Sequence, residues 1–234
     1  MHSGKPMRAM ILAAGRGERL RPLTDTLPKP LAPIAGRPLL VHQLEWLARA
    51  GVRDIVINLH HLGAQIEAVI GTGTTHGVRV RYSREDTRLE TGGGIVQALP
   101  MLGPDPFLLL NGDIFTDFPF EQLSGALAAT DDAHLVLTPR PPHRATGDFE
   151  ARGGRVTARG QTHVYCGIAV LHPRLFAGCA AVPFSLRDLL FAALDRRALG
   201  ATVWNGYWMD VGTPEQLAAV DEQARAWRGI APPA

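Results

Sequence analysis

The stretch that decides the fold runs from Ala9 to Leu20 and reads AMILAAGRGERL. Its first part, Ala9–Leu12, is short, continuous and apolar, which is typical of a buried strand in a parallel sheet. Gly15 and Gly17 follow directly, and glycines after such a strand let backbone N–H groups come close to a phosphate. The stretch therefore predicts a strand and turn of an α/β protein that holds an anion.

Apolar runs alternate with helical patterns on both sides of residue 60. The runs predict strands, and the 3.6-residue patterns between them predict helices. The expected strands are 9–12, 54–59, 78–82, 107–110 and 134–137, and the expected helices are 38–50, 64–70, 94–102 and 120–129. This alternation is typical of a mostly parallel, twisted sheet with helices on both faces. We expect a Rossmann-like three-layer α/β sandwich.

The sequence pattern changes after Thr138, where prolines and glycines separate short apolar segments. Pieces around Phe149, Val156 and 165–171 predict antiparallel strands added to the main sheet. A helix is expected at 185–199 and a strand at 202–210, with Trp204 and Trp208 on one face of that strand. Thr213-Pro214-Glu215-Gln216 resembles a capping box that opens the last helix.

The bulk composition excludes several partner classes. Lys and Arg number 24 against 22 Asp and Glu, so the net charge of +2 gives no general attraction to nucleic acid or acidic membranes. Cys166 and Cys179 are in no metal-binding or redox spacing, which is typical of a reducing compartment. No apolar run is long enough to span a bilayer, and no secretory segment follows Met1–Pro6. We expect a cytoplasmic protein with a local anion site.

Three readings of the glycine turn compete. A dinucleotide fingerprint needs a third small residue, where Leu20 stands, and an acid after the second strand, which ends Asn58-Leu59-His60-His61. A P-loop needs Gly-Lys-Ser/Thr, which the chain lacks. The third reading is a loop that wraps a triphosphate, with cations nearby. These are Arg16, Arg19, Arg21 and Lys29, the last stiffened by Pro28 and Pro30. The remaining alternative is a solvated basic surface loop.

Two aspartates follow expected strands far apart in the chain. Asp113 comes after the most apolar strand, and Asp210 ends the strand at 202–210. Ligands of open parallel sheets bind outside the carboxyl ends of the strands. Two carboxylates there suit Mg²⁺, which prefers oxygen ligands and shares them with phosphates. The alternative is that each aspartate only caps a turn.

Four sequence blocks together resemble the sugar-1-phosphate nucleotidylyltransferase family. They are LAAGRGERLRPLT at 12–24, PKPL at 28–31, NGD at 111–113 and WMDVGT at 208–213. The resemblance extends from Arg8 to about Arg225. It implies an enzyme that joins a nucleoside triphosphate to a sugar 1-phosphate with Mg²⁺ and releases pyrophosphate.

The resemblance also implies a role for each matching residue. Asp113 and Asp210 would bind the metal, and Arg19 and Lys29 would complete the catalytic set. The sugar would meet Asn111, Asp148 and Arg144. The nucleotide would meet Ala13, Ala14, Gly15, Gly17, Glu18, Arg19, Lys29, Glu90, Thr91, Gly92 and Gly93. It further implies one domain, residues 1–234, divided into a flexible N-terminus (1–7), a nucleotide-binding half (8–138), a sugar-binding half (139–213) and a C-terminal helix and tail (214–234).

Within the family, the substrates are less firmly indicated. LETGGG at 89–94, TGDF at 146–149 and the lack of a C-terminal β-helix resemble the branch that uses UTP and N-acetylmuramate α-1-phosphate in peptidoglycan recycling. Mannose or glucose 1-phosphate with GTP or dTTP is the alternative. Lysine occurs only at Lys5 and Lys29, so the family's second lysine, which holds the sugar phosphate, has no counterpart. Arg140 and Arg144 are candidates for the lactyl carboxylate, with exposed loop arginines as the alternative.

Two other classes of function remain in view. A nucleotide-sugar-binding regulatory protein would keep the fold without turnover, but it would not need both Asp113 and Asp210. A dinucleotide-dependent oxidoreductase is disfavoured by the incomplete fingerprint. We expect a monomer or a small homo-oligomer.

Overall fold

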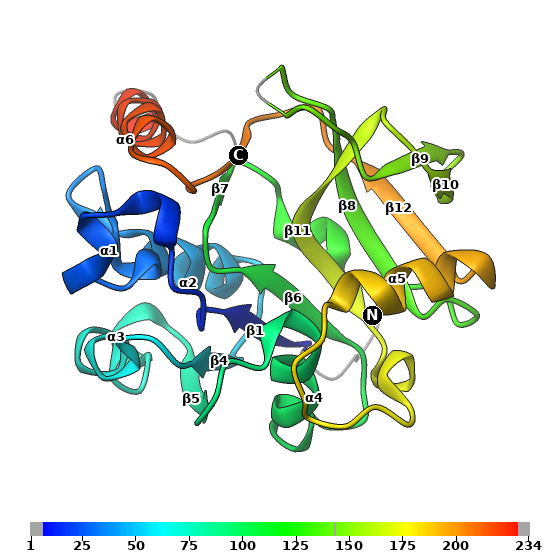
Figure 1. Cartoon of the computed structure of the whole chain (residues 1–234), viewed down its shortest axis with the longest axis horizontal. Coiled ribbons are helices and arrows are strands. Elements are labelled where there is room, and N and C mark those ends of the chain that lie inside the picture. The colour runs from blue at the N-terminus through cyan, green and yellow to red at the C-terminus, as the bar shows by residue number, and fades with distance from the viewer. Residues whose placement is uncertain (1–6, 143, 229–234) are drawn as a thin grey trace.

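The computed structural model describes residues 7–142 and 144–228. At its centre is a nine-stranded sheet in the order β5-β4-β1-β6-β11-β8-β12-β10-β9 (Figure 1). In chain order its strands are β1 (Arg8–Leu12), β4 (Asp54–Leu59), β5 (Arg79–Arg84), β6 (Phe107–Asn111), β8 (Ala133–Pro139), β9 (Phe149–Arg152), β10 (Arg155–Arg159), β11 (His163–Leu171) and β12 (Leu199–Val203). The expected flexible N-terminus falls outside the described residues except for Met7, as does the expected tail from residue 229.

The smaller elements surround this sheet. Two short two-stranded sheets pair β2 (Pro33–Ile34) with β3 (Arg37–Pro38), and β7 (Ile114–Thr116) with β13 (Trp208–Asp210). The α-helices are α1 (Leu23–Thr26), α2 (Leu39–Arg49), α3 (Gly63–Ile70), α4 (Glu90–Leu102), α5 (Leu186–Asp195) and α6 (Pro214–Arg228). As the capping box predicts, the Thr213 hydroxyl accepts the Gln216 N–H at the start of α6. No helix of the described part is long and apolar enough to cross a bilayer.

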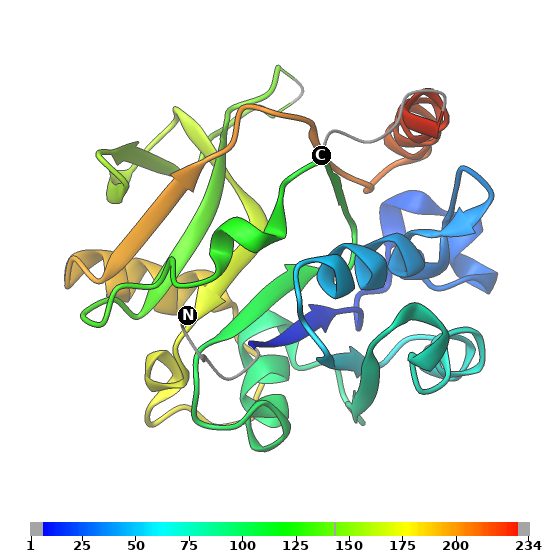
Figure 2. The same cartoon turned by 180° about the vertical axis from the view of Figure 1, so that it is seen from behind.

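The sheet separates two apolar cores because successive side chains of a strand point to opposite faces. In β1, Ala9 and Ile11 join one core while Met10 joins the other. Helices α2 and α3 cover the first face, and α4 and α5 cover the second, as the two opposite views show (Figures 1 and 2). This confirms the expected three-layer α/β class. Strands β5, β4, β1 and β6 are parallel, and β11 adds the expected antiparallel portion.

The expected helix at 120–129 is wrong. Only a short 3₁₀ turn, Phe120–Leu123, forms there. The turn ends at Ser124, whose φ of −65° and ψ of +113° are extended, and Gly125 then takes a φ of +76°. Phe120 and Leu123 are nevertheless buried, so the apolar spacing reflects core contacts made by a turn.

The end of the chain also differs from expectation. The helix expected at 185–199 ends at Asp195, and Arg197 takes a left-handed φ of +57° before β12 begins. The strand expected at 202–210 is two strands in two sheets, β12 and β13. The chain folds over the Trp204 ring, where a Cβ on Gly206 would come within 2.3 Å. Trp204 and Trp208 therefore do not share one strand face. They donate to Asp117 Oδ1 and to the Cys166 carbonyl, respectively.

Candidate functional site

Three parallel strands end at the same level. Leu12, the last residue of β1, is in register with Asn58 of β4 and with Asn111 of β6. The glycine turn follows β1, and Gly112 and Asp113 follow β6, so both segments meet at the carboxyl edge where α/β proteins bind ligands.

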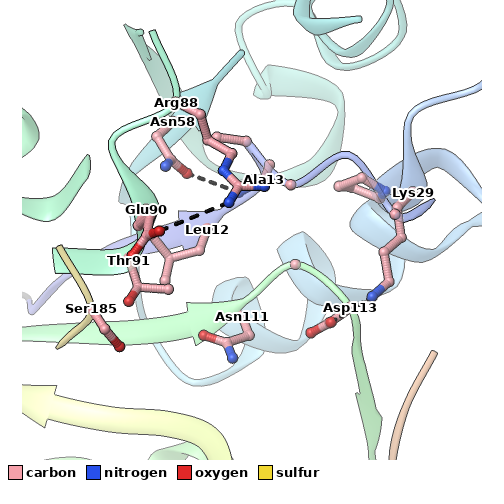
Figure 3. A pocket seen from close by; sticks show the side chains of 15 residues that line it. Leu12, Ala13, Lys29, Asn58, Arg88, Glu90, Thr91, Asn111, Asp113 and Ser185 are labelled. Carbon is pink, nitrogen blue, oxygen red and sulfur yellow. Dashed lines mark hydrogen bonds and ion pairs between the residues drawn. The ribbon is translucent and has the colours of Figure 1, made fainter. Parts of the chain in front are cut away.

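The glycine turn folds directly onto Lys29. Gly17 has a φ of +64°, and a Cβ there would lie 2.9 Å from Thr24 Cγ2 and 3.2 Å from Lys29 Cβ. The Thr24 hydroxyl donates to the Gly17 carbonyl at 2.8 Å. Lys29 in turn donates from Nζ to Asp113 Oδ2 at 2.6 Å (Figure 3). The turn, the lysine and the first aspartate therefore form one contact set, which the motif blocks predicted.

Strand pairing brings the two distant aspartates together. β13 runs antiparallel to β7 with Asp210 opposite Ile114, the residue after Asp113. The Val211 N–H also donates to the Asp113 carbonyl at 2.7 Å. The backbones of Asp113 and Asp210 therefore lie side by side, and their shared metal ion stays a prediction.

These residues fit a magnesium ion. The described residues hold no group of three or more His, Cys, Asp or Glu that would form a complete metal cage. Mg²⁺ usually takes one or two carboxylates and completes its shell with phosphate oxygens and water. Two neighbouring aspartates beside a glycine turn match that mode of magnesium binding.

Asp210 is held by its own set of partners. Arg144 donates to Asp210 Oδ2 at 2.7 Å, and Gln216 donates to Oδ1 at 3.3 Å. The Arg144 guanidinium also lies 5.9 Å from the Trp208 ring centroid. Each candidate metal ligand therefore contacts one cation, Lys29 or Arg144. Arg140 instead donates to two backbone carbonyls, those of Gln161 and Arg144.

Two cavities open at this edge. The larger, of about 370 Å³, lies over the strand ends (Figure 3). It is lined by Leu12, Ala13, Ala14, Gly15, Gly17, Lys29, Pro30, Asn58, Arg88, Glu90, Thr91, Asn111, Gly112, Asp113 and Ser185. The smaller, of about 220 Å³, is lined by Thr91, Asn111, Asp148, Phe149, Tyr165, Ser185, Leu186, Arg187 and Leu190. Thr91, Asn111 and Ser185 border both cavities, so the two are neighbours with a shared wall.

Most predicted site residues fall on these walls, and six do not. Glu18, Arg19, Gly92, Gly93, Arg144 and Asp210 line neither cavity. Arg19 still lies near the segment that follows Asp210, since a Cβ on Gly212 would come within 2.8 Å of its guanidinium. Arg144 and Asp210 contact each other beside Asp113, as described above.

Gly92 and Gly93 have a packing role that the sequence did not reveal. A Cβ on Gly92 would lie 2.2 Å from the Phe184 ring, and one on Gly93 would lie 2.0 Å from the Val182 carbonyl oxygen. Hydrogen bonds tie the same segments: Gly92 N–H to the Phe184 carbonyl (2.9 Å), Phe184 N–H to the Leu89 carbonyl (3.3 Å) and Leu186 N–H to Thr91 Oγ1 (2.8 Å). We call this joint between 89–92 and 182–186 the clasp.

Glu90 is held in an unusual backbone conformation at the start of α4. Its φ is +59°, in the left-handed region that residues other than Gly, Asn and Asp rarely adopt. Its carboxylate lies 3.8 Å from the Arg88 guanidinium, over the larger cavity (Figure 3). Strain of this kind gathers at ligand sites, which supports the predicted role of Glu90 near the nucleotide.

A buried network of hydrogen bonds links the glycine turn to Leu89, the residue before α4. The Ala13 N–H donates to Asn58 Oδ1 at 2.8 Å, and Asn58 Nδ2 donates to Glu85 Oε1 at 2.7 Å. Glu85 Oε2 then accepts the Leu89 N–H at 3.0 Å. Sequence analysis did not single out Glu85. The acid follows the neighbouring strand β5, and only strand order places it beside Asn58.

Gln43 of α2 supports the loop that carries Asp113. Its side chain is fully buried, and its Nε2 donates to the carbonyls of Asn111 (3.0 Å) and Ile114 (2.9 Å). Those two residues bracket Gly112 and Asp113. Sequence analysis did not single out Gln43. The signal that could have revealed it is a lone glutamine on an apolar helix face.

We expect Gln43→Leu to lower the free energy of unfolding by about 1–3 kcal/mol, because two buried carbonyls lose their donor. The activity should fall as the Asp113 loop loosens. Urea denaturation measures the first effect. Gln65→Leu is the matched control, since half-buried Gln65 also donates to a backbone carbonyl, that of Thr26, in a solvent-exposed hydrogen bond. Equal losses for the two variants would contradict the support role.

The comparisons with known proteins agree with this geometry. A family model described as nucleotidyl transferase matches residues 8–157. The chain is 43% identical to N-acetylmuramate alpha-1-phosphate uridylyltransferase of Neisseria meningitidis, over 95% of this chain and 100% of that protein. It is 34% identical to mannose-1-phosphate guanyltransferase of Aspergillus fumigatus over 90% of its own length, and it spans 62% of that longer protein.

A solved structure shows the same fold. HddC from Yersinia pseudotuberculosis, complexed with GMP-PN, superposes with a TM-score of 0.76 at 22% identity, covering 93% of this chain and 99% of that one. The matched family model, the full-length relative and the paired aspartates beside the glycine turn lead to one conclusion: the chain belongs to the sugar-1-phosphate nucleotidyltransferase family of enzymes.

Proposed function

We propose that the protein transfers the uridylyl group of UTP to N-acetylmuramate α-1-phosphate, giving the UDP-sugar and pyrophosphate. The observation that carries the proposal is the pair of neighbouring cavities, one over the glycine turn and one beside Asp148, that meet at Asn111 next to Asp113. The choice of substrates is supported by the end-to-end match to the Neisseria uridylyltransferase. Such a reaction would serve peptidoglycan recycling in the cytoplasm, where UTP is made.

The larger cavity would hold the nucleotide. Backbone N–H groups of Ala13–Gly17 would meet the triphosphate, with Arg19 and Lys29 supplying positive charge. Glu90 and Thr91 would lie beside the base. Mg²⁺ held by Asp113 and Asp210 would neutralise charge on the phosphates.

The smaller cavity would hold the sugar against Asn111 and Asp148. An oxygen of the sugar phosphate attacks the α-phosphorus of UTP, forming a new P–O bond. The bond from that phosphorus to the bridging oxygen breaks, and pyrophosphate leaves with its electron pair. The attacking oxygen is already anionic near neutral pH, so no general base is needed, and positioning and charge neutralisation provide the catalysis.

Arg144 would take the place of the missing family lysine. Its guanidinium sits on Asp210 and its side chain is 39% exposed, so it can reach an entering phosphate. With Asp210 holding Mg²⁺, the Arg144 guanidinium would be free of its carboxylate partner and available to the sugar phosphate. We also propose the division into a nucleotide-binding half (8–138) and a sugar-binding half (139–213). We also propose a monomer or small homo-oligomer.

A matrix of triphosphates against sugar 1-phosphates, scored by pyrophosphate release with Mg²⁺, tests the proposal. We expect UTP with N-acetylmuramate α-1-phosphate to give a kcat/KM at least about tenfold above any other pair, since one well-placed recognition contact changes the rate by that much or more. GTP with mannose 1-phosphate, the pair suggested by the Aspergillus relative, is the main alternative. A higher value for that pair would replace the proposed substrates.

A further inference from the structure

The smaller cavity contains one cation that the site described so far does not use. Asp148 and Arg187 are the only charged residues on its wall. Arg187 is in the first turn of α5, just after the N-cap Ser185, whose Oγ accepts the Arg187 N–H. Its guanidinium makes no hydrogen bond or ion pair with any residue of the described part of the chain. A cation placed on a cavity wall without an anionic partner is available to a ligand.

The other arginines near the sugar site are engaged. Arg144 pairs with Asp210, and Arg140 donates to two backbone carbonyls. Neither of them lines the smaller cavity. The two arginines that the sequence suggested for a sugar carboxylate are therefore less well placed than Arg187.

The remaining wall suits an uncharged part of the same ligand. Phe149 and Leu186 are apolar and buried. The Tyr165 hydroxyl is buried without a hydrogen-bond partner among the described residues, and burial raises the pKa of this phenol. The Tyr165 N–H holds Asp148 Oδ2 at 3.0 Å, which fixes the second charged group of the cavity.

We propose that Arg187 binds a carboxylate carried by the acceptor sugar and makes the enzyme prefer acidic sugar phosphates over neutral ones. A guanidinium pairs with a carboxylate through two parallel hydrogen bonds, which gives both strength and direction. The N-terminus of α5 adds positive potential at the same place. This inference rests on the proposed function only in taking the smaller cavity as the acceptor site. The two anionic groups of such an acceptor are then divided, with the phosphate at Arg144 and the carboxylate at Arg187.

The test compares two acceptors that differ only by the lactyl acid, N-acetylmuramate α-1-phosphate and N-acetylglucosamine α-1-phosphate. The proteins are the wild type, Arg187→Gln, Arg187→Lys and the control Arg49→Gln. Arg49 is exposed on α2 and lines neither cavity. Pyrophosphate release gives kcat/KM, and calorimetry with a non-hydrolysable UTP analogue present gives Kd for each sugar phosphate.

We expect Arg187→Gln to reduce the preference for the acidic acceptor about 10- to 100-fold in both kcat/KM and Kd, because a charged hydrogen-bond partner is lost. Arg187→Lys should keep part of the preference, since lysine keeps the positive charge but cannot make the two parallel hydrogen bonds of a guanidinium. Arg49→Gln should keep the whole preference. An unchanged preference in Arg187→Gln would overturn the assignment of Arg187 while leaving the proposed reaction standing. A wild type that favours the neutral acceptor would overturn both.

Discussion

Replacing Asp113 with Asn is expected to lower kcat by about a thousandfold while leaving the fold intact. The carboxylate lines the same cavity as the glycine turn, and it also contacts Lys29 at 2.6 Å. An amide of the same shape removes the charge that a magnesium ion needs. Losing one such electrostatic contact at a reacting phosphoryl group typically costs two to three orders of magnitude. Pyrophosphate release at saturating substrates measures the effect.

The control for this prediction is Asp195→Asn. Asp195 is exposed at the end of α5 and lines neither cavity. Asp195→Asn should retain full activity and unfold within about 2 °C of the wild type, as variants with a surface-exposed change usually do. A magnesium titration adds a second reading, because Asp113→Asn should need a much higher metal concentration for its residual rate. Near-normal turnover at ordinary magnesium would refute the metal assignment.

Gly112→Ala is expected to reduce kcat about a hundredfold and the free energy of unfolding by about 1–3 kcal/mol. A Cβ on Gly112 would lie 2.5 Å from the Leu12 carbonyl oxygen, which also accepts the Gly112 N–H at 2.8 Å. Leu12 cannot retreat because β1 pairs with a strand on each side. The strain must therefore move the segment that carries Asp113, and displacements of about 1 Å at a reacting centre have effects of this size.

Gly125→Ala separates this local effect from general destabilisation. Gly125 also needs glycine, since its φ is +76°, but a Cβ there would meet nothing within 4 Å and the residue is far from the cavities. We expect a comparable loss of stability, seen in urea denaturation, with kcat unchanged at temperatures where both variants are folded. If the two glycine variants lost activity equally, displacement of Asp113 would not be the cause.

The parts of the structure that follow from local sequence were predictable. Strands such as β1 and β6 are continuous apolar runs, and their carboxyl ends carry the glycine turn and Asp113. The blocks around Lys29 and Asp210 have fixed internal spacing, so their resemblance to a family located them without a structure. Pairing of β7 with β13 sets Asp210 opposite Ile114, the residue after Asp113.

The errors have a common physical origin. Apolar spacing at 120–129 and 202–210 records which side chains are buried, but it cannot show where the backbone leaves a helix or strand, as it does at Ser124 and around Gly206. The missed site residues, Glu85 and Arg187, depend on which strand lies beside β4 and on where α5 begins over the sheet. Those facts arise from tertiary arrangement, so no window of sequence contains them.

The clasp has a consequence for redesigning this enzyme. Each of its two segments contributes a residue to the wall that the two cavities share, Thr91 from 89–92 and Ser185 from 182–186. Grafting a relative's 182–187 segment alone would leave its side chains facing a helix start shaped for Phe184 and Val182. A chimera with altered sugar choice should therefore exchange both segments as a single cassette, and selection for a new acceptor should yield mutations that cluster in pairs across this joint.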